Sequence, residues 1–579
     1  MCGIAGLVGV DPRGDEIEQM TERLAHRGPD AAGVWRGEGV ALGHRRLAIL
    51  DLREVGTQPM HRGPLALTYN GEIYNFRTLR KALPGPFHTE TDTEVLLHLF
   101  AREGDAALQR LHGMFAFALW DAESRTLFAA RDRLGIKPLF YRTLPGGGLA
   151  LASEIKALIA LGPATSDPSA LSDFFTYRYV PTPKTIYRDI RKLPAGHSLR
   201  WQAGHVQISR WWQPEASTRR RDPVAAREEL GALLTEAVQS HTVSDVPLGV
   251  FLSGGLDSSA TVACLERPRT FSVGFDVASY DELPFARRVA THFGTEHHER
   301  RVEALDVDEA LEASVQMLDE PFGDSSTFAT FVVSREARKH VGVALSGDGG
   351  DEIFGGYGWY AKWFRYGSSR TAALAAALLP PFSASGRSLS RRGAPPLARY
   401  ASLVGAFSPA QKRALLVPEI ANAVEDERWA WRAHWRPELP PLQRMQWLDL
   451  HTFLPDDILT KVDRASMAVS LEVRPPLLDH RLVEFALTLH PDLLQQGGLG
   501  KQLLREWLRP RVPSEVLTRP KRGFSMPVRR WLAAEPARLE AAMARLARTG
   551  VLRNAKIPRL GSDQLWCLLI LDRWLQHAA

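Results

Sequence analysis

The sequence predicts an α/β protein of two domains, and its length and a change of pattern along the chain support this. With 579 residues, 45% of them hydrophobic, the chain is too long for one ordinary core, because domains usually contain about 100–200 residues. Residues 1–210 combine short predicted strands with a few helices, whereas residues 224–579 alternate strands and helices. We therefore predict packed antiparallel sheets with flanking helices in the first domain and a parallel α/β sheet in the second.

Several segments of the first domain have the features of regular elements. A helix is expected after Asp92, whose carboxylate can cap the apolar run 95–100. Four apolar stretches bounded by turn residues are predicted strands: 4–9, 41–44, 65–69 and 127–131.

A linker is predicted over residues 205–225, where prolines and the basic run Arg219-Arg220-Arg221 interrupt the pattern. We interpret that run as solvated. Residues 368–400, rich in Ala, Ser, Arg and Pro, are predicted to form peripheral helices and loops. The buried parallel strands expected beyond the linker are 247–252, 270–275 and 341–345.

The composition excludes several classes of protein. The chain has 72 Lys and Arg residues and 66 Asp and Glu residues, so the basic excess is small, and the basic residues are scattered. We therefore expect no nucleic-acid partner. The three cysteines, Cys2, Cys264 and Cys567, fit neither a metal site nor a disulfide framework, which indicates a reducing cytoplasm. No stretch approaches the ~20 apolar residues of a membrane helix, and the N-terminus does not have the features of a signal peptide. A cytoplasmic protein without membrane partners is therefore expected.

Cys2 is a candidate nucleophile. Removal of Met1 would leave Cys2 with a thiol and a free α-amine, and an α-amine with a pKa near 8 can accept the thiol proton. Position alone fits an ordinary near-terminal cysteine equally well.

The strongest local motif is Leu-Ser-Gly-Gly-Leu-Asp-Ser-Ser at residues 252–259. It lies between a predicted strand and a predicted helix, where glycines and free N–H groups can approach a phosphate. The sequence G-x-x-x-x-G-K-[ST] is absent, so we expect this loop to hold the β- and γ-phosphates while the α-phosphate is attacked. Asp257 is placed to bind Mg²⁺. The alternative is a plain Gly/Ser turn.

A second cluster of Gly and Asp occupies residues 345–352 after the predicted strand 341–345. In a parallel sheet both loops lie at the carboxyl edge, where ligands bind. Asp257 and Asp351 could then share a Mg²⁺ on the nucleotide phosphates. Taken alone, the second cluster could be a surface turn.

Ordered motifs along nearly the whole chain resemble those of the glutamine-dependent asparagine synthetases. These motifs lie at residues 2–6, 26–30, 44–47, 69–75, 130–139, 152–158, 253–258 and 463–467. The resemblance implies an N-terminal-nucleophile αββα sandwich in residues 1–210. It also implies an adenylating synthetase domain, similar to adenine nucleotide α-hydrolases, in residues 224–579.

In the first domain, the resemblance implies that Cys2 attacks the side-chain amide of glutamine. The Asn70 side chain and the Gly71 backbone N–H would form the oxyanion hole. The residues expected to hold the α-carboxylate and α-ammonium of glutamine are Arg46, Glu72 and Asp92. Taken alone, Asn70-Gly71 would be a hairpin turn and Asp92 a helix cap.

In the second domain, the resemblance implies Mg²⁺ ligation by Asp257 and Asp351, and charge neutralisation at the α-phosphate by Lys461. A lone Lys is more often a solvated surface residue. The expected ATP contacts are Phe251, Leu252, Ser253, Gly254, Gly255, Asp257, Ser258, Val273, Ser346 and Gly347.

Asp348 departs from the best-known bacterial form of the family, which carries Glu at this position in a role in the adenylated-intermediate step. The expected reaction converts aspartate, glutamine and ATP to asparagine, glutamate, AMP and pyrophosphate, with an internal tunnel for ammonia. Because Asp is one methylene shorter than Glu, a different carboxylate acceptor, in secondary metabolism or polysaccharide modification, is the alternative. A non-catalytic scaffold is disfavoured because the chain keeps Cys2, Arg46, Asn70 and Asp257. A homodimer is a further expectation.

Overall fold

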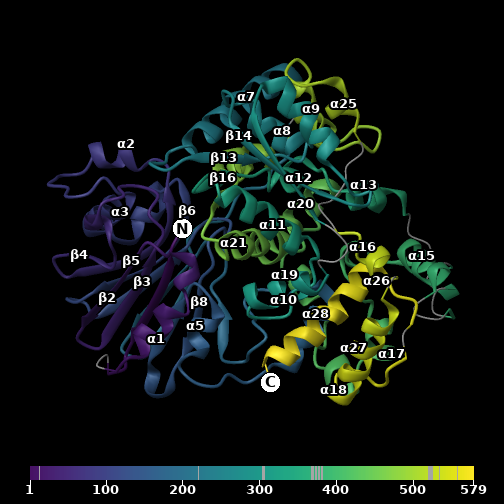
Figure 1. Ribbon diagram of the computed structural model, residues 1–579, viewed down its shortest axis with the longest axis horizontal. Helices are drawn as coiled ribbons and strands as arrows, with labels where there is room; N and C mark the ends of the chain where they lie inside the picture. Colours follow the sequence, from purple (N-terminus) through teal and green to yellow (C-terminus); the bar gives the residue numbers. More distant parts are fainter. Residues whose placement is uncertain are drawn as a thin grey trace.

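The computed structural model describes residues 1–11, 14–219, 221–302, 307–366, 371, 374–375, 378–379, 383–519, 526–533, 535–556 and 558–578. The N-terminal and C-terminal halves of the chain lie side by side, and the N-terminus lies between them, near β6 and α21 (Figure 1). Within the described part of the chain, no helix combines the length and the apolar character needed to cross a membrane.

The first half contains two six-stranded sheets, in the orders β10-β8-β9-β1-β3-β2 and β12-β11-β7-β6-β5-β4. The strands are β1 (Gly3–Val8), β2 (Ala31–Gly37), β3 (Val40–Arg46), β4 (Met60–Arg62), β5 (Leu65–Ile73), β6 (Gly113–Asp121), β7 (Thr126–Arg131), β8 (Phe140–Thr143), β9 (Leu149–Ala152), β10 (Ile190–Lys192), β11 (His197–Gln202) and β12 (His205–Arg210). The helices are α1 (Glu16–Glu22), α2 (Phe76–Lys81), α3 (Asp92–Glu103), α4 (Ala107–Arg110), α5 (Ile155–Ile159) and α6 (Pro168–Tyr177).

Three apolar cores hold these elements in four layers. Ile4 of β1 and Ala116 of β6 belong to the core between the two sheets. Alternate side chains point to opposite faces of a strand, so Ala5 faces the other way and packs against α1 and α5. On the outer face of the second sheet, Phe115 packs against α2 and α3. The layers confirm the αββα sandwich, and the four predicted strands correspond to β1, β3, β5 and β7.

Two local interpretations of this half were wrong. The N-cap of α3 is Thr91, whose hydroxyl accepts the N–H of Glu94 at 3.3 Å, and Asp92 is the first helical residue. Asn70 and Gly71 lie within β5, opposite Ala116 and Phe115 of β6, so they do not form a hairpin turn. Their side of the strand is therefore available to a site.

The linker crosses the surface of the second half. Arg219 is exposed, as expected for a solvated run, but its N–H donates to the carbonyl of Thr488 at 2.9 Å. Arg221 stacks 5.1 Å from the centre of the Phe485 ring and donates to Thr488 Oγ1 at 3.1 Å. Arg221 is therefore not simply solvated, and Arg220 lies outside the described residues.

The second half is built on one parallel five-stranded sheet, in the order β15-β14-β13-β16-β17. The strands are β13 (Leu248–Phe251), β14 (Arg269–Phe275), β15 (Glu296–Val302), β16 (Val343–Leu345) and β17 (Glu472–Arg474). The helices are α7 (Pro223–Ser240), α8 (Leu256–Val262), α9 (Leu283–Phe293), α10 (Val307–Met317), α11 (Ser326–Arg338), α12 (Gly350–Phe354), α13 (Gly358–Arg365), α15 (Ala384–Gly393), α16 (Pro396–Val404), α17 (Pro409–Leu415), α18 (Pro418–Ala421), α19 (Trp429–Ala433), α20 (Pro441–His451), α21 (Leu459–Met467), α22 (His480–Leu487), α23 (Pro491–Leu494), α24 (Gln502–Leu508), α25 (Ser514–Thr518), α26 (Val528–Leu532), α27 (Pro536–Arg548) and α28 (Ser562–Ala578).

The parallel sheet confirms the prediction for the second half. The two Gly-rich loops follow β13 and β16, which are neighbours in the sheet, so both loops emerge at the same carboxyl edge. Part of the predicted peripheral segment forms α15 and the start of α16, while residues 368–370, 372–373, 376–377 and 380–382 lie outside the described residues.

Candidate active sites

Cys2 lies directly before β1 and contacts Asn70 of β5. The backbone N–H of Cys2 donates to Asn70 Oδ1 at 2.8 Å, which fixes the orientation of the Asn70 amide. Asn70 Nδ2 is buried and has no hydrogen-bond partner among the residues that the structure describes. A Cβ on Gly71 would lie 2.3 Å from the Met114 carbonyl oxygen, so only glycine fits there. An unused amide donor beside a cysteine is the arrangement that an oxyanion hole requires.

The buried position of Cys2 disfavours the thiolate. Burial raises the pKa of Cys2, while the terminal amine, a contact with the Leu47 carbonyl and the charge of Arg46 act in the opposite direction. Met1 is still present here, and its ammonium lies 2.7 Å from Glu472 Oε2. Nucleophilic attack by Cys2 therefore needs a base, which the α-amine would supply once Met1 is removed.

Arg46 is the last residue of β3 and is held by the loop that follows the strand. Its guanidinium donates to the carbonyl oxygens of Leu50, Asp51 and Arg53, with the Arg53 distance 2.8 Å, and none of these bonds uses Nε. A Cβ on Gly56 would lie 2.4 Å from Arg46 Nη2, so this glycine leaves the guanidinium its space. Arg46 is thus a rigid cation near Cys2, as a carboxylate partner should be.

Glu72 and Asp92 place two carboxylates in the same buried region. Asp92 Oδ2 accepts the Tyr69 hydroxyl at 2.6 Å and the Ile73 N–H at 2.9 Å. Burial raises the pKa of Asp92 to about 6, and burial also raises the pKa of Glu72 well above its usual range. Glu72 Oε1 has no hydrogen-bond partner among the described residues. Two buried carboxylates of this kind would be stabilised as anions by a bound ammonium group.

The two Gly-rich loops of the second half contact each other. A Cβ on Gly347 would lie 2.9 Å from the Ser258 N–H nitrogen, and a Cβ on Gly350 would lie 2.3 Å from Asp257 Oδ1. Only glycine permits so close an approach. The structure therefore brings the two predicted phosphate loops into one site.

The first loop is held by its own serines. Ser253 Oγ lies 3.1 Å from Ser258 Oγ and accepts the Gly255 N–H at 3.2 Å. Gly254 has a φ of +67°, and a Cβ there would lie 2.5 Å from the Phe285 carbonyl carbon. The loop thus has a defined conformation without a ligand.

The remaining predicted ATP contacts surround these loops. Phe251 ends β13 and Leu252 follows it directly, while Val273 lies on the adjacent strand β14. The Ser346 N–H donates to the Arg474 carbonyl at 2.9 Å. Ser346 Oγ is buried without a hydrogen-bond partner among the described residues, so it can receive a ligand.

Lys501 is a residue of this site that the sequence interpretation missed. Its ammonium forms ion pairs with Asp257 Oδ2 and, at 2.6 Å, with Asp351 Oδ1. Lys501 is buried, has a φ of 61° and precedes α24. The one available signal was the stretch Gly497-Gly498-Leu499-Gly500 before it.

The Asp257–Asp351 pair fits a Mg²⁺ site. Both carboxylates converge on one cation, the Lys501 ammonium, so the position favours positive charge. No group of three or more His, Cys, Asp or Glu residues suited to a metal occurs in the described part of the chain. Mg²⁺ is commonly held by one or two carboxylates together with substrate phosphates, so two protein ligands are sufficient.

Lys461 lies on α21 and is buried rather than solvated. Its ammonium donates to Asp324 Oδ2 and Ser326 Oγ, both at 2.9 Å. Burial alone lowers the pKa of Lys461, but Asp324, Asp457 and Asp348 outweigh it and raise the pKa. Lys461 therefore remains charged near Asp348, while its role at the α-phosphate stays a prediction.

A narrow cavity beside Asp348 is lined by residues of both halves. Ile136 and Lys137 of the first half line it together with Asp348, Leu459, Val462, Asp463, Val473 and Pro475 of the second. Burial lowers the pKa of Lys137 to about 8. The cavity therefore lies where the two halves meet, beside Asp348.

Arg27 connects the first half to the second beside Cys2. Its guanidinium is fully buried and donates to both oxygens of Asp463, at 2.8 and 3.0 Å, and to Glu154 Oε1 at 2.7 Å. Its Nε–H donates to the Cys2 carbonyl at 3.1 Å. Two motifs far apart in the sequence, 26–30 and 463–467, therefore meet beside Cys2.

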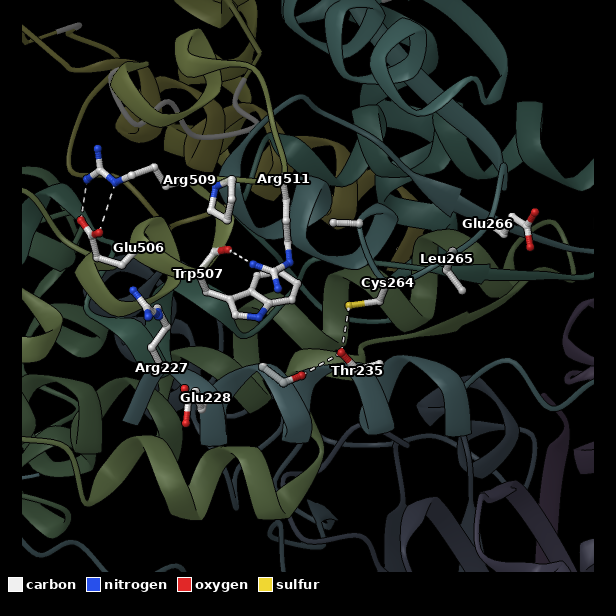
Figure 2. A pocket seen from close by; sticks show the side chains of 13 residues that line it. Arg227, Glu228, Thr235, Cys264, Leu265, Glu266, Glu506, Trp507, Arg509 and Arg511 are labelled. Carbon is white, nitrogen blue, oxygen red and sulfur yellow. Dashed lines mark hydrogen bonds and ion pairs between the residues drawn. The ribbon is translucent and has the colours of Figure 1, made fainter. Parts of the chain in front are cut away.

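A cavity of the second half lies away from the predicted residues. It has a volume of about 950 Å³ and lies beyond the C-terminal ends of α8 and α24, with Cys264 and Trp507 in its wall (Figure 2). Burial raises the pKa of Cys264 to about 11, and its sulfur lies 3.9 Å from Thr235 Oγ1. A thiol of this kind is not activated as a nucleophile.

Comparisons with known proteins agree with both halves. Residues 229–576 match the asparagine synthase family, and residues 1–212 match the glutamine amidotransferase domain. The chain is 38% identical to a Mycobacterium tuberculosis protein provisionally named a glutamine-hydrolyzing asparagine synthetase, covering 99% of this chain and 95% of that protein. It is 34% identical to glutamine-hydrolyzing asparagine synthetase 1 of Bacillus subtilis, covering 92% and 88%.

A relative with a different name is the Penicillium rubens protein called amidase chyE, which is 28% identical over 89% of this chain and 85% of that protein. Family members therefore differ in the names given to their activities. The chain belongs to the asparagine synthase family and, because a glutamine amidotransferase domain precedes its synthase domain, is a glutamine-dependent ligase.

Proposed function

We propose that the protein makes asparagine from aspartate, with glutamine as nitrogen donor and ATP as activator. The balanced reaction consumes aspartate, glutamine, ATP and water and gives asparagine, glutamate, AMP and pyrophosphate. One observation carries the proposal: this chain contains both sites. Cys2 lies beside the Asn70 amide, whose Nδ2 has no hydrogen-bond partner among the described residues, and the two predicted phosphate loops contact each other.

In the glutaminase half, the free α-amine of Cys2 takes the thiol proton after removal of Met1, and sulfur attacks the side-chain carbonyl of glutamine. Asn70 Nδ2 and the Gly71 N–H stabilise the tetrahedral oxygen. Collapse releases ammonia and leaves a thioester on Cys2, which water hydrolyses to glutamate. Arg46 holds the α-carboxylate of glutamine, while Glu72 and Asp92 hold its α-ammonium.

In the synthetase half, residues 253–258 hold the β- and γ-phosphates while a carboxylate oxygen of the acceptor attacks the α-phosphate and pyrophosphate leaves. Asp257 and Asp351 would hold Mg²⁺, which neutralises phosphate charge when bound. Lys461 supplies further positive charge at the α-phosphate. Ammonia then attacks the acyl-adenylate and displaces AMP.

We further propose that ammonia moves through the narrow cavity lined by Ile136, Lys137 and Asp348. In water at neutral pH ammonia is mostly protonated and no longer nucleophilic. A route shielded by both halves avoids this loss.

The alternative is the same chemistry with another carboxylate acceptor. Asp348, one methylene shorter than Glu, and the differently named relative from Penicillium rubens support it. Purified protein is incubated with glutamine, ATP and either aspartate or a panel of carboxylic acids, and AMP and pyrophosphate are followed. Pyrophosphate release with aspartate supports asparagine synthesis. Release only with another acid shows that aspartate is not the acceptor.

A cytoplasmic location, a homodimer and a division of the chain near residues 210 and 224 are parts of the same proposal. Light scattering of the purified chain tests the homodimer, and fractionation of the cells tests the location.

A further inference from the structure

Arg474 is fully buried at the end of β17, the strand next to β16. Its carbonyl oxygen accepts the N–H of Ser346 at 2.9 Å. Ser346 begins the loop that carries Asp348 and leads into α12, whose first turn contains Asp351. The backbone of Arg474 therefore fixes the point at which this phosphate loop leaves the sheet.

The side chain of Arg474 extends in the other direction, into the glutamine pocket. Its Nη2 donates to Glu72 Oε2 at 3.1 Å, across 402 residues of sequence. Its Nη1 donates to the carbonyls of His241 and Val243, at 2.8 and 2.6 Å, and its Nε donates to Glu472 Oε1 at 2.6 Å. These four acceptors surround the guanidinium and leave it one orientation.

The charge of Arg474 matters because its surroundings are acidic. Glu72, Asp92 and Glu472 are all buried. Among the main influences on the pKa of Glu72, the cations are Arg474 and the terminal amine. Burial raises the pKa of Glu72, and Arg474 is the largest opposing influence. Loss of Arg474 would remove this opposing influence and favour protonation of Glu72 further, which weakens its attraction for an ammonium group.

We propose that Arg474 is a positioning residue that orients Glu72 for the α-ammonium of glutamine, and that it links this pocket to the phosphate loop through Ser346. The inference rests on the proposed role of Glu72 in glutamine binding. A shift of the loop on nucleotide binding would move the β17 backbone and with it the guanidinium, so nucleotide would change the affinity for glutamine.

The test compares Arg474→Gln and Arg474→Lys with the wild type. Glutamine hydrolysis is measured with and without ATP and the acceptor, and pyrophosphate release is measured with ammonia in place of glutamine. We expect Arg474→Gln to raise the KM for glutamine about tenfold while kcat changes less than about threefold, because binding rather than chemistry is affected. The nucleotide effect on this KM should disappear, and ammonia-dependent pyrophosphate release should stay within about threefold.

Arg474→Lys keeps the charge but loses the planar set of guanidinium donors. Its KM for glutamine should therefore lie between those of Arg474→Gln and the wild type, and little of the nucleotide effect should remain. Arg481→Gln is the matched control, since Arg481 is a partly exposed neighbour paired with Asp479 and Glu236. It should leave the KM for glutamine unchanged.

An unchanged glutamine KM in a variant that retains ammonia-dependent activity overturns the inference. If neither variant folds, the wild-type protein still tests the inference. An equal KM for glutamine with and without nucleotide would contradict the proposed link between the glutamine pocket and the phosphate loop. A wild-type protein without glutamine hydrolysis or pyrophosphate release would instead contradict the proposed function itself.

Discussion

Arg27 and Asp463 form a two-pronged ion pair between the halves of the chain, with distances of 2.8 and 3.0 Å. Because both side chains are buried, neither charge can be solvated if its partner is lost. Arg27→Ala should therefore lower the free energy of unfolding by about 3–5 kcal/mol, as measured by chemical denaturation. Arg36→Ala, which breaks an exposed pair with Glu18, is the control and should cost no more than about 1 kcal/mol. Equal losses in both variants would contradict the prediction.

Cys2→Ala should abolish glutamine-dependent pyrophosphate release and leave the ammonia-dependent reaction intact. The synthetase half needs only NH₃, whereas glutamine cannot release it without the thiol. Both rates can be followed in one pyrophosphate assay. Cys264→Ala, at a thiol outside the site, is the matched control. Loss of both rates in Cys2→Ala would show that the two chemistries cannot be separated.

Asn70→Ala should reduce kcat for glutamine hydrolysis about 10²–10³-fold, since one oxyanion donor is lost. The KM for glutamine should change little because Asn70 acts on the oxygen that becomes charged. Steady-state hydrolysis assays give both values, and Asn422→Ala, at an exposed asparagine, serves as control. A rise in KM with an unchanged kcat would assign Asn70 to binding instead.

Lys501→Met should tighten the binding of Mn²⁺ in the absence of nucleotide. The ammonium of Lys501 now neutralises Asp257 and Asp351 and competes with a divalent cation. Its removal should strengthen binding about tenfold, which corresponds to about 1.4 kcal/mol. Electron paramagnetic resonance of free Mn²⁺ measures this without any activity assay. Lys339→Met at an exposed lysine should have no effect, and unchanged affinity in Lys501→Met would exclude the site.

Asp92→Asn should change how stability depends on pH. Burial raises the pKa of Asp92 to about 6 from the ordinary 3.8, so the folded protein favours the protonated acid. Protonated Asp92 therefore adds its full contribution to the free energy of unfolding below pH 3.8, and this contribution is lost as pH rises through about 6. Relative to wild type, Asp92→Asn should therefore gain up to about 3 kcal/mol between pH 4 and pH 7.5.

Urea unfolding at the two pH values measures the gain in Asp92→Asn. Asp105→Asn, at an exposed carboxylate, is the control and should show no such change. A difference between Asp92→Asn and wild type that is the same at both pH values would contradict the raised pKa.

The phosphate site could be predicted because its parts are local. Asp257 and Asp351 each follow a predicted strand within a few residues, and parallel strands end at a common edge. Lys501 could not be predicted in this way, since it enters the same site from a distant loop. Its place depends on how α24 packs, and packing is not visible in a local pattern.

The glutaminase pocket shows the same limit. Cys2, Asn70 and Arg46 occur in recognisable motifs, but the partner of Glu72 is Arg474, from the other half of the chain. Glu472 and Arg474 alternate with apolar residues, a pattern that also suits a strand with one solvated face. Only the docking of the two halves turns that face inward. Asp92 was mistaken for a cap because the adjacent Thr91 offers the same hydrogen bond one residue earlier.

β17 has only three residues and is an edge strand of its sheet. The first half covers it, with Glu72 bonded to Arg474 and with Ile136 and Lys137 lining the same narrow cavity as Val473. A fragment beginning near residue 224 would expose this edge to other copies of itself, and exposed edges promote aggregation. We expect that mutation can silence the two chemistries one at a time, but the polypeptide should be produced, purified and engineered as a single piece.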